Sequence, residues 1–119
     1  MTNDLARKKC LPCEGGIAPL APAEIAPLLA GLQGWDYFDK LSGGYRAAPI
    51  ISKTFTFNNY YETLAFVNAV AWLSHREDHH PDMTVGYKTC RIEYTTHAIG
   101  GLSLNDFICA AKVDALFDI

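Results

Sequence analysis

The stretch from Asn59 to Pro81 constrains the fold of this chain more than any other. Asn59 is a favoured residue at the start of a helix, and Glu62 follows it at the spacing of a capping box. Apolar residues then recur at helical spacing as far as Leu73. Pro81 ends any helix, because proline lacks a backbone donor and restricts the residue before it. We therefore predict a helix that begins after Asn59 and runs through Leu73.

Alternating side chains before and after this helix predict two pairs of strands. The first pair covers residues 35–38 and 45–57, and the second covers residues 83–87 and 90–96. In the longest segment, aromatic and β-branched residues alternate with Ser and Thr, although Lys53 interrupts the apolar side. The last two segments are joined by a two-residue link, which predicts an antiparallel hairpin.

Two further helices complete the predicted fold. Residues 22–32 form a short helix in spite of the interior Pro27, and a last helix runs from Ser103, with Asp106 three residues later, to about Leu116. The element order is α-β-β-α-β-β-α. We predict an α+β fold with two layers, in which helices pack on one face of a four-stranded antiparallel sheet.

Length and charge limit the organisation and the partners of the chain. At 119 residues we expect one domain over residues 22–119, preceded by a flexible arm over residues 1–21, where Pro and Gly are frequent and no periodicity is seen. The net charge of -3 argues against nucleic acid as a direct partner. No apolar run is long enough to span a membrane, and the N-terminus lacks a secretory pattern, so we expect a cytoplasmic protein.

The four cysteines fall into two groups. Cys10 and Cys13 form a C-x-x-C pair in the arm, a spacing found in zinc sites and in redox dithiols. The sequence has no second such pair, and the segment does not resemble a strand-to-helix junction, so a metal or redox role for the pair is the less favoured interpretation. Cys90 and Cys109 lie in apolar patterns that predict small core residues.

The histidines are the candidates for chemistry. His79 and His80 follow the predicted helix, where a stiff support holds side chains that titrate near neutral pH. His75 lies four residues before His79, so on one helix both would share a face, and with His97 they would supply three metal ligands. Arg76 occupies the position where the zinc-protease motif has glutamate. A metal site and four unrelated surface histidines stay open as alternatives to acid–base chemistry.

Several separated positions together resemble the pterin-4a-carbinolamine dehydratase family. The resemblance covers about residues 22–116, and the expected element order agrees with the α+β fold of that family. The matching residues are Asp78-His79-His80-Pro81, Tyr87, Thr95-Thr96-His97 and Asp106, with Gly34-Trp35 at the first strand.

The resemblance implies a lyase that removes water from 4a-hydroxytetrahydrobiopterin and gives quinonoid dihydropterin. It implies neither a metal nor an organic cofactor. By resemblance His79, His80 and His97 are catalytic, with His80 and His97 as the principal proton-transfer pair and His79 orienting or sharing the work.

The resemblance also assigns residues that bind or support the pterin. Asp106 would orient His97 or hold its protonated form, and it also stands where a helix-capping acid would. Trp35 would form an aromatic wall of the site or lie in the core. Besides the histidines and Trp35, the implied substrate-binding residues are Asp78, Thr95, Thr96 and Ala98, and the supporting residues are His75, Pro81 and Asp106.

The resemblance finally implies partners. The family recycles the pterin cofactor of an aromatic amino acid hydroxylase, which is the expected functional link. The strongly apolar helix after Asn59 predicts a homodimer or homotetramer. The alternative function is an interaction protein or transcriptional coactivator that acts through the same helix.

Overall fold

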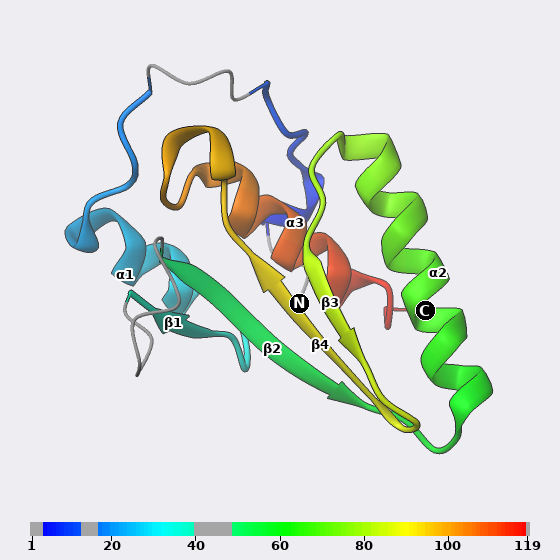
Figure 1. Cartoon of the computed structure of the whole chain (residues 1–119). Helices are drawn as coiled ribbons and strands as arrows, with labels where there is room; N and C mark the ends of the chain where they lie inside the picture. Colours follow the sequence, from blue (N-terminus) through cyan, green and yellow to red (C-terminus); the bar gives the residue numbers. More distant parts are fainter. Residues whose placement is uncertain (1–3, 13–16, 40–48, 119) are drawn as a thin grey trace.

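The computed structural model describes residues 4–12, 17–39 and 49–118, which form an α+β fold (Figure 1). The predicted fold class and element order are confirmed. The beginning of the longest predicted strand, at residues 45–48, lies outside the described residues. In chain order the elements are the 3-10 helix η1 (Asp4–Arg7), α1 (Pro22–Ala30), β1 (Asp36–Phe38), β2 (Ile50–Thr56), α2 (Tyr60–Glu77), β3 (Asp82–Val85), β4 (Thr89–Tyr94), the 3-10 helix η2 (His97–Ile99) and α3 (Leu104–Ala115).

The four strands form one antiparallel sheet in the order β1-β2-β4-β3. The pair β2 and β4 is central, and Ile51 lies opposite Tyr94 while Phe55 lies opposite Cys90. Helices α2 and α3 cover the same face of the sheet, as the sequence predicts (Figure 1). The β3–β4 hairpin is also confirmed, with Gly86 donating to the Thr89 carbonyl at 2.8 Å.

Lys53 interrupts the apolar side of β2 because it has acidic and carbonyl partners there. Its Nζ donates to Asp114 Oδ1 of α3 at 2.9 Å and to the Gln33 carbonyl at 2.8 Å. The neighbouring positions on the same side, Ile51 and Phe55, are buried. Exposed Thr54 and Thr56 alternate with buried Phe55 in the second half of the strand, whereas Ile50 and Ser52 are buried on the other side, and the lysine ties the sheet to α3.

The start of α2 forms only part of the predicted capping box, because the Glu62 carboxylate bonds the N–H of Asn58 and not that of Asn59. The Asn59 side chain accepts the Glu62 N–H at 2.9 Å, while the Glu62 carboxylate accepts the Asn58 N–H at 3.2 Å. Phe66 and Val70 are buried against the core. The helix continues through Glu77, past the predicted Leu73. It therefore reaches almost to the paired histidines.

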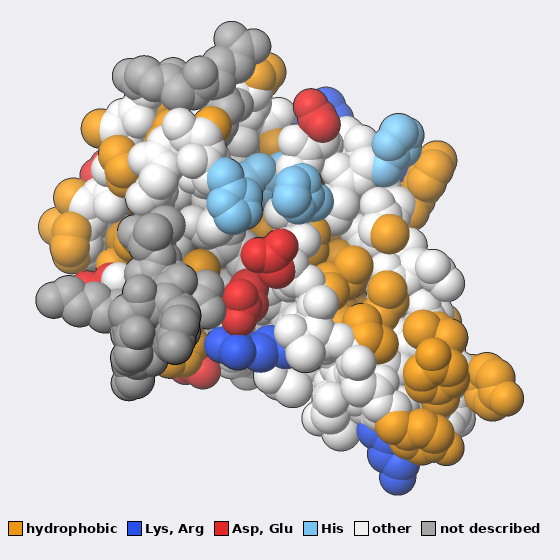
Figure 2. Space-filling view, in the orientation of Figure 1, with side chains coloured by type: hydrophobic (Ala, Val, Ile, Leu, Met, Phe, Trp, Pro, Cys, Tyr) orange, Lys and Arg blue, Asp and Glu red, His pale blue; other side chains and the backbone are white. Residues whose placement is uncertain are grey.

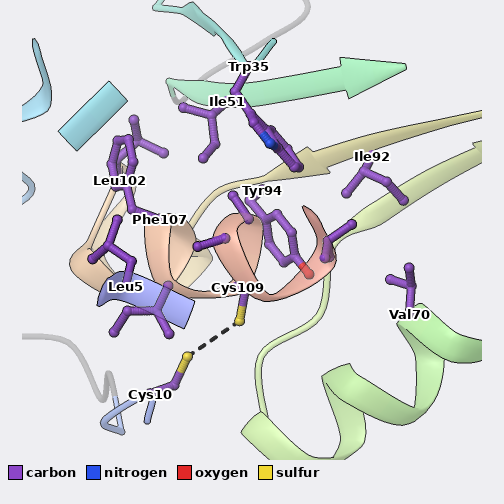
Figure 3. Packing of buried hydrophobic residues seen from close by; sticks show 14 of the residues in the cluster. Leu5, Cys10, Trp35, Ile51, Val70, Ile92, Tyr94, Leu102, Phe107 and Cys109 are labelled. Atoms are coloured by element: carbon purple, nitrogen blue, oxygen red, sulfur yellow. Dashed lines mark hydrogen bonds between the residues drawn. The ribbon is translucent and has the colours of Figure 1, made fainter. Parts of the chain in front are cut away.

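The core is arranged around α3, which is buried along most of its length (Figure 3). Tyr94 and Phe107 are fully buried between the sheet and this helix. On the far side of α3, Leu5 of η1 and Cys10 join the same cluster. The described part of the N-terminal arm thus packs on the domain.

Helix α1 keeps Pro27 in its interior and ends at Ala30, two residues before the predicted end. Ile25 of this helix is buried in the core. Within the described residues, no helix combines the length and hydrophobicity needed to cross a membrane.

Candidate active site

The paired histidines leave α2 through a left-handed residue. Asp78 caps the helix with φ 51° and ψ 42°, and the His79 N–H bonds the Ser74 carbonyl at 3.2 Å. The buried Pro81 follows and bars further helix. Because the helix ends before His79, the expected shared helix face of His75 and His79 is wrong. The turn directs His79 and His80 away from the helix axis.

His97 reaches the same region from the end of β4. The strand ends at Tyr94, two residues before its predicted end at residue 96, and His97 begins η2. An isolated bridge pairs Thr96 with Gly101, with the Thr96 N–H donating to the Gly101 carbonyl at 3.0 Å. Gly100 ends η2 with φ 65°, a conformation that favours glycine. These contacts form a short closed loop that presents His97.

The two segments meet at a cavity of about 280 Å³, called here the histidine cavity. It contains seven of the residues expected from the sequence and three from elsewhere. Histidine side chains gather on this face of the molecule (Figure 2). The lining residues are Asp78, His79, His80, Thr95, Thr96, His97 and Ala98, together with Leu11, Pro12 and Asn105.

A buried carboxylate holds one histidine at the floor of the cavity. Asp106 is fully buried, and its Oδ1 lies 2.7 Å from His79 Nε2. Its Oδ2 accepts the Thr96 hydroxyl at 2.8 Å and the Ser103 N–H at 2.9 Å. The His79 ring also stacks on Tyr94, with centroids 5.8 Å apart and planes 7° apart. We call these residues the floor: His79, Thr96, Ser103 and Asp106.

The contacts of Asp106 correct one expectation and satisfy another. Its histidine partner is His79 and not His97, because α3 approaches the cavity from beneath the α2 exit. The Ser103 N–H contact is the helix-capping interaction that the spacing of Ser103 and Asp106 predicts. One carboxylate therefore caps α3 and fixes the orientation of an imidazole.

The other two imidazoles form the mouth of the cavity. His80 and His97 are exposed, their ring centroids are 6.3 Å apart and their planes differ by 27°. The contact of His80 Nδ1 with the Pro81 carbonyl is long, at 3.5 Å. Both rings can therefore meet a ligand that enters from solvent. Two neighbouring imidazoles can supply an acid and a base at neutral pH.

Comparison with known proteins identifies the family. The family model described as pterin 4 alpha carbinolamine dehydratase matches residues 18–116. The chain belongs to this dehydratase family. A protein of Nitrosospira multiformis named "Putative pterin-4-alpha-carbinolamine dehydratase" is 62% identical over 117 residues, which is 98% of this chain and 96% of that protein. A protein of Nitrosomonas eutropha with the same name is 64% identical over 119 residues, covering 98% and 97%.

Two solved structures are similar in fold. A "transcriptional coactivator/pterin dehydratase" from Brucella melitensis has a TM-score of 0.70 and 26% identity, covering 82% of this chain and 97% of its own. A "pterin dehydratase-like protein" described as a RuBisCO assembly factor in the alpha-carboxysome has a TM-score of 0.57 and 28% identity, covering 72% and 92%. The dehydratase fold therefore occurs in proteins that are described with different functions.

Some residues implied by the family resemblance lie away from the histidine cavity. Trp35 is buried in the core, and its Nε1–H donates to Asp114 Oδ2 at 3.0 Å. His75 is exposed on α2, with its ring 5.3 Å from that of Trp72. Neither Trp35 nor His75 lines the cavity. Pro81 does not line it either, but it ends the helix and so fixes the turn that carries His79 and His80.

Leu11, Pro12 and Asn105 were missed by sequence reasoning. The first two lie before the segment that the family model matches, in a stretch without periodicity. Asn105 directly precedes Asp106 in the first turn of α3, and the burial of its side chain is seen only in the structure. Its Oδ1 accepts the Leu11 N–H at 3.0 Å.

The remaining alternative from the sequence was a metal site. Among the residues that the structure describes, no three His, Cys, Asp or Glu side chains are grouped so that they would hold a metal ion.

Proposed function

We propose that this chain dehydrates 4a-hydroxytetrahydrobiopterin to quinonoid dihydropterin and water by acid–base catalysis with histidine. The observation that supports this most directly is the convergence of His79, His80 and His97 on one cavity. Membership of the dehydratase family supports the reaction class. The specific roles of the histidines are our inference from their contacts.

The reaction needs two proton transfers. Hydroxide is a poor leaving group, so an acid protonates the 4a-oxygen as the carbon–oxygen bond breaks. A base removes a proton from a ring nitrogen, and the freed electron pair forms the new carbon–nitrogen double bond. Positioned acid–base groups each contribute roughly 100- to 10,000-fold to such a step.

We assign these transfers to the mouth of the cavity. His80 and His97 are exposed and neighbouring, so one ring can protonate the leaving oxygen while the other accepts the nitrogen proton. His79 has a different role, because its Nε2 is engaged by Asp106 at 2.7 Å. That contact fixes which nitrogen carries the proton and leaves Nδ1 for the ligand. His79 therefore orients the pterin or shares in the proton transfer.

The same cavity supplies groups that suit the polar edge of a pterin. Asp78 and the segment from Thr95 to Ala98 line it beside the histidines. Backbone N–H and carbonyl groups in such a segment can pair with the amide-like edge of the ring. We infer that this segment binds the pterin, and that the product returns to an aromatic amino acid hydroxylase.

A direct assay of carbinolamine breakdown tests this proposal. We expect His80→Ala and His97→Ala to slow the reaction strongly while their unfolding transitions stay close to that of the unsubstituted chain. His75→Ala is the matched control, because His75 is an exposed histidine of α2 outside the cavity. Rates near that of the unsubstituted chain in both cavity variants would refute the assignment.

The outer face of α2 supports a second candidate, an interaction function. Tyr61 and Trp72 are 81% and 64% exposed, whereas Phe66 and Val70 on the inner face are buried. Hydrophobic side chains gather over the N-terminal part of α2 and the adjacent hairpin (Figure 2). We propose that this face mediates self-association into a homodimer or homotetramer. The similar Brucella melitensis protein is described as a transcriptional coactivator, which makes another protein the alternative partner.

Light scattering on Tyr61→Ser and Trp72→Ser distinguishes self-association from binding to another protein. Self-association predicts a lower molar mass for these variants than for the unsubstituted chain. An unchanged mass would contradict self-association through this face and leave the interaction with another protein to be tested by capture.

A further inference from the structure

Two thiols from distant parts of the chain meet behind the histidine cavity. Cys10 Sγ of the N-terminal arm lies 3.3 Å from Cys109 Sγ of α3, and both residues are buried (Figure 3). A disulfide requires a separation of about 2 Å, so the two sulfurs need to move only a little over 1 Å closer. The cysteines are free thiols in this structure.

Contacts that do not involve sulfur already hold this part of the arm against α2 and α3. The Cys10 N–H donates to Glu77 Oε1 at the end of α2, at 2.9 Å. The next residue, Leu11, donates its N–H to Asn105 Oδ1 and accepts the Asn105 side-chain amide at its carbonyl, at 3.0 and 2.5 Å. Lys112 Nζ of α3 donates a hydrogen bond to the Ala6 carbonyl at 2.8 Å. The sulfur contact is therefore part of a docked arm and not a chance approach.

We propose that Cys10 and Cys109 are an oxidisable dithiol, at which a peroxide converts the docking of the N-terminal arm into a covalent link. The arm reaches the histidine cavity immediately after Cys10, because Leu11 and Pro12 line it. A disulfide at this position fastens one wall of the cavity to α3, the helix that also carries Asp106. The effect on pterin binding rests on the proposed function, whereas the disulfide itself does not.

Burial assigns a different part to each sulfur, because Cys10 is 9% exposed whereas Cys109 is fully buried. Cys10 sulfur gives up its proton and attacks the peroxide, breaking the oxygen–oxygen bond. The Cys10 sulfenic acid forms, and the released proton joins the departing hydroxide as water. Cys109 sulfur then attacks the sulfenic sulfur, its proton passes to the departing hydroxide, and a second water leaves. In sum, two thiols and one hydrogen peroxide give one disulfide and two waters, so the sulfurs are oxidised and the peroxide oxygen is reduced.

The environment of Cys109 fits this order. Its hydrogen bond with Cys10 raises the pKa of the Cys109 thiol, and burial raises it further. A thiol that keeps its proton is a poor first nucleophile but can resolve a sulfenic acid that lies in contact with it. Cys90 offers an internal comparison, because burial in the sheet raises its pKa and it lies in β4, away from the arm. We expect Cys90 to stay reduced.

Peptide mapping of the full chain after mild hydrogen peroxide tests the link. We expect a Cys10–Cys109 disulfide in the unsubstituted chain and in Cys13→Ser, and its absence in Cys10→Ser and Cys109→Ala. The Cys13→Ser variant is the matched control, since it removes the other cysteine of the C-x-x-C pair. A Cys10–Cys13 disulfide as the main product, or Cys10 oxidised beyond the sulfenic acid beside an unmodified Cys109, would overturn the proposal.

Two measurements on oxidised and reduced protein test the fastening. Amide hydrogen exchange at Leu11 should slow on oxidation, because the arm can no longer leave α3, and unchanged exchange would refute the fastening. The KM for the pterin should be no higher in the oxidised chain, and a raised KM would mean that the disulfide displaces the wall. Failure of the proposed dehydratase reaction would appear in the histidine variants and leave the peptide map unaffected.

Discussion

At the floor of the histidine cavity, His79 is only 12% exposed and is fixed by a buried carboxylate, whereas at the mouth His80 and His97 are exposed. The floor uses four polar groups that satisfy one another beneath the protein surface. The mouth keeps two rings free of any comparably short contact in the described structure. The buried, fixed imidazole and the exposed ones are thus neighbours, and under the proposed mechanism substitutions at floor and mouth should have different effects.

The largest expected effect is on the rate at the mouth. His97→Ala should slow carbinolamine breakdown by roughly 100- to 10,000-fold, because it removes a positioned acid or base. The midpoint of urea unfolding should change little, since an exposed side chain contributes little to the core. Stopped-flow kinetics and urea titration of the same preparation measure both. A large loss of stability with an unchanged rate would reverse the division between mouth and floor.

The next effect is at the floor and should change both stability and rate. Asp106→Asn keeps the size of the side chain but can present an amide donor to His79, which forces the imidazole into the other tautomer. Loss of the charged hydrogen bonds should lower the free energy of unfolding by about 1–3 kcal/mol.

Nitrogen NMR of the imidazole tests this cause directly. We expect the protonated nitrogen of His79 to change in Asp106→Asn, with a slower reaction in the same variant. The tautomer of His97 is the control and should stay as it is. An unchanged His79 spectrum with a reduced rate would require another explanation for the role of Asp106.

A smaller effect concerns the docked arm and its dependence on pH. Burial alone would raise the pKa of Glu77, but the Cys10 N–H and the nearby Lys112 and Lys9 outweigh burial and lower it below 4.5. A carboxylate with a lowered pKa in the folded state stabilises the protein above its unfolded pKa, and this stability is lost as the pH falls through the folded pKa. Glu77→Gln should cost about 1 kcal/mol at neutral pH.

Urea titrations of Glu77→Gln and the unsubstituted chain at several pH values test this linkage. The difference in unfolding free energy between the two should shrink as the pH falls below 4.5. A difference that stays constant with pH would contradict the assigned role of the Glu77 charge.

The smallest effect on rate is expected far from both parts of the cavity. Trp35→Phe removes the indole N–H that donates to Asp114, which should cost about 1 kcal/mol of unfolding free energy. The rate and KM should stay unchanged, because Trp35 does not line the cavity. A raised KM would restore Trp35 as a wall of the pterin site.

Local signals made most of the fold predictable. The Asn59 cap, the alternation along β2 and the short hairpin link each depend on residues close together in the chain, and all appear in the structure. The sequence shows Lys53 as an exception to the apolar side of β2. It could not explain that exception, because the partner Asp114 lies 61 residues away in the chain.

The site was predictable only in part, for the same reason. The residues around His79 and His97 were expected together, but the choice of His79 as the partner of Asp106 depends on how α3 passes under the turn after α2. The docking of Leu11 depends on Asn105, 94 residues away in the chain. Such long-range pairings leave no periodic trace in a single sequence.

The bridge between Thr96 and Gly101 has a consequence for how a ligand is received. It closes a loop of four residues that begins with His97, and the Ile99 and Gly100 N–H groups bond back across the turn to the Thr96 and His97 carbonyls. The backbone entropy of ordering this loop is therefore lost when the protein folds and not when a ligand binds. A ligand that enters the cavity meets a preorganised imidazole, so its binding free energy is not reduced by the cost of ordering the backbone that carries His97.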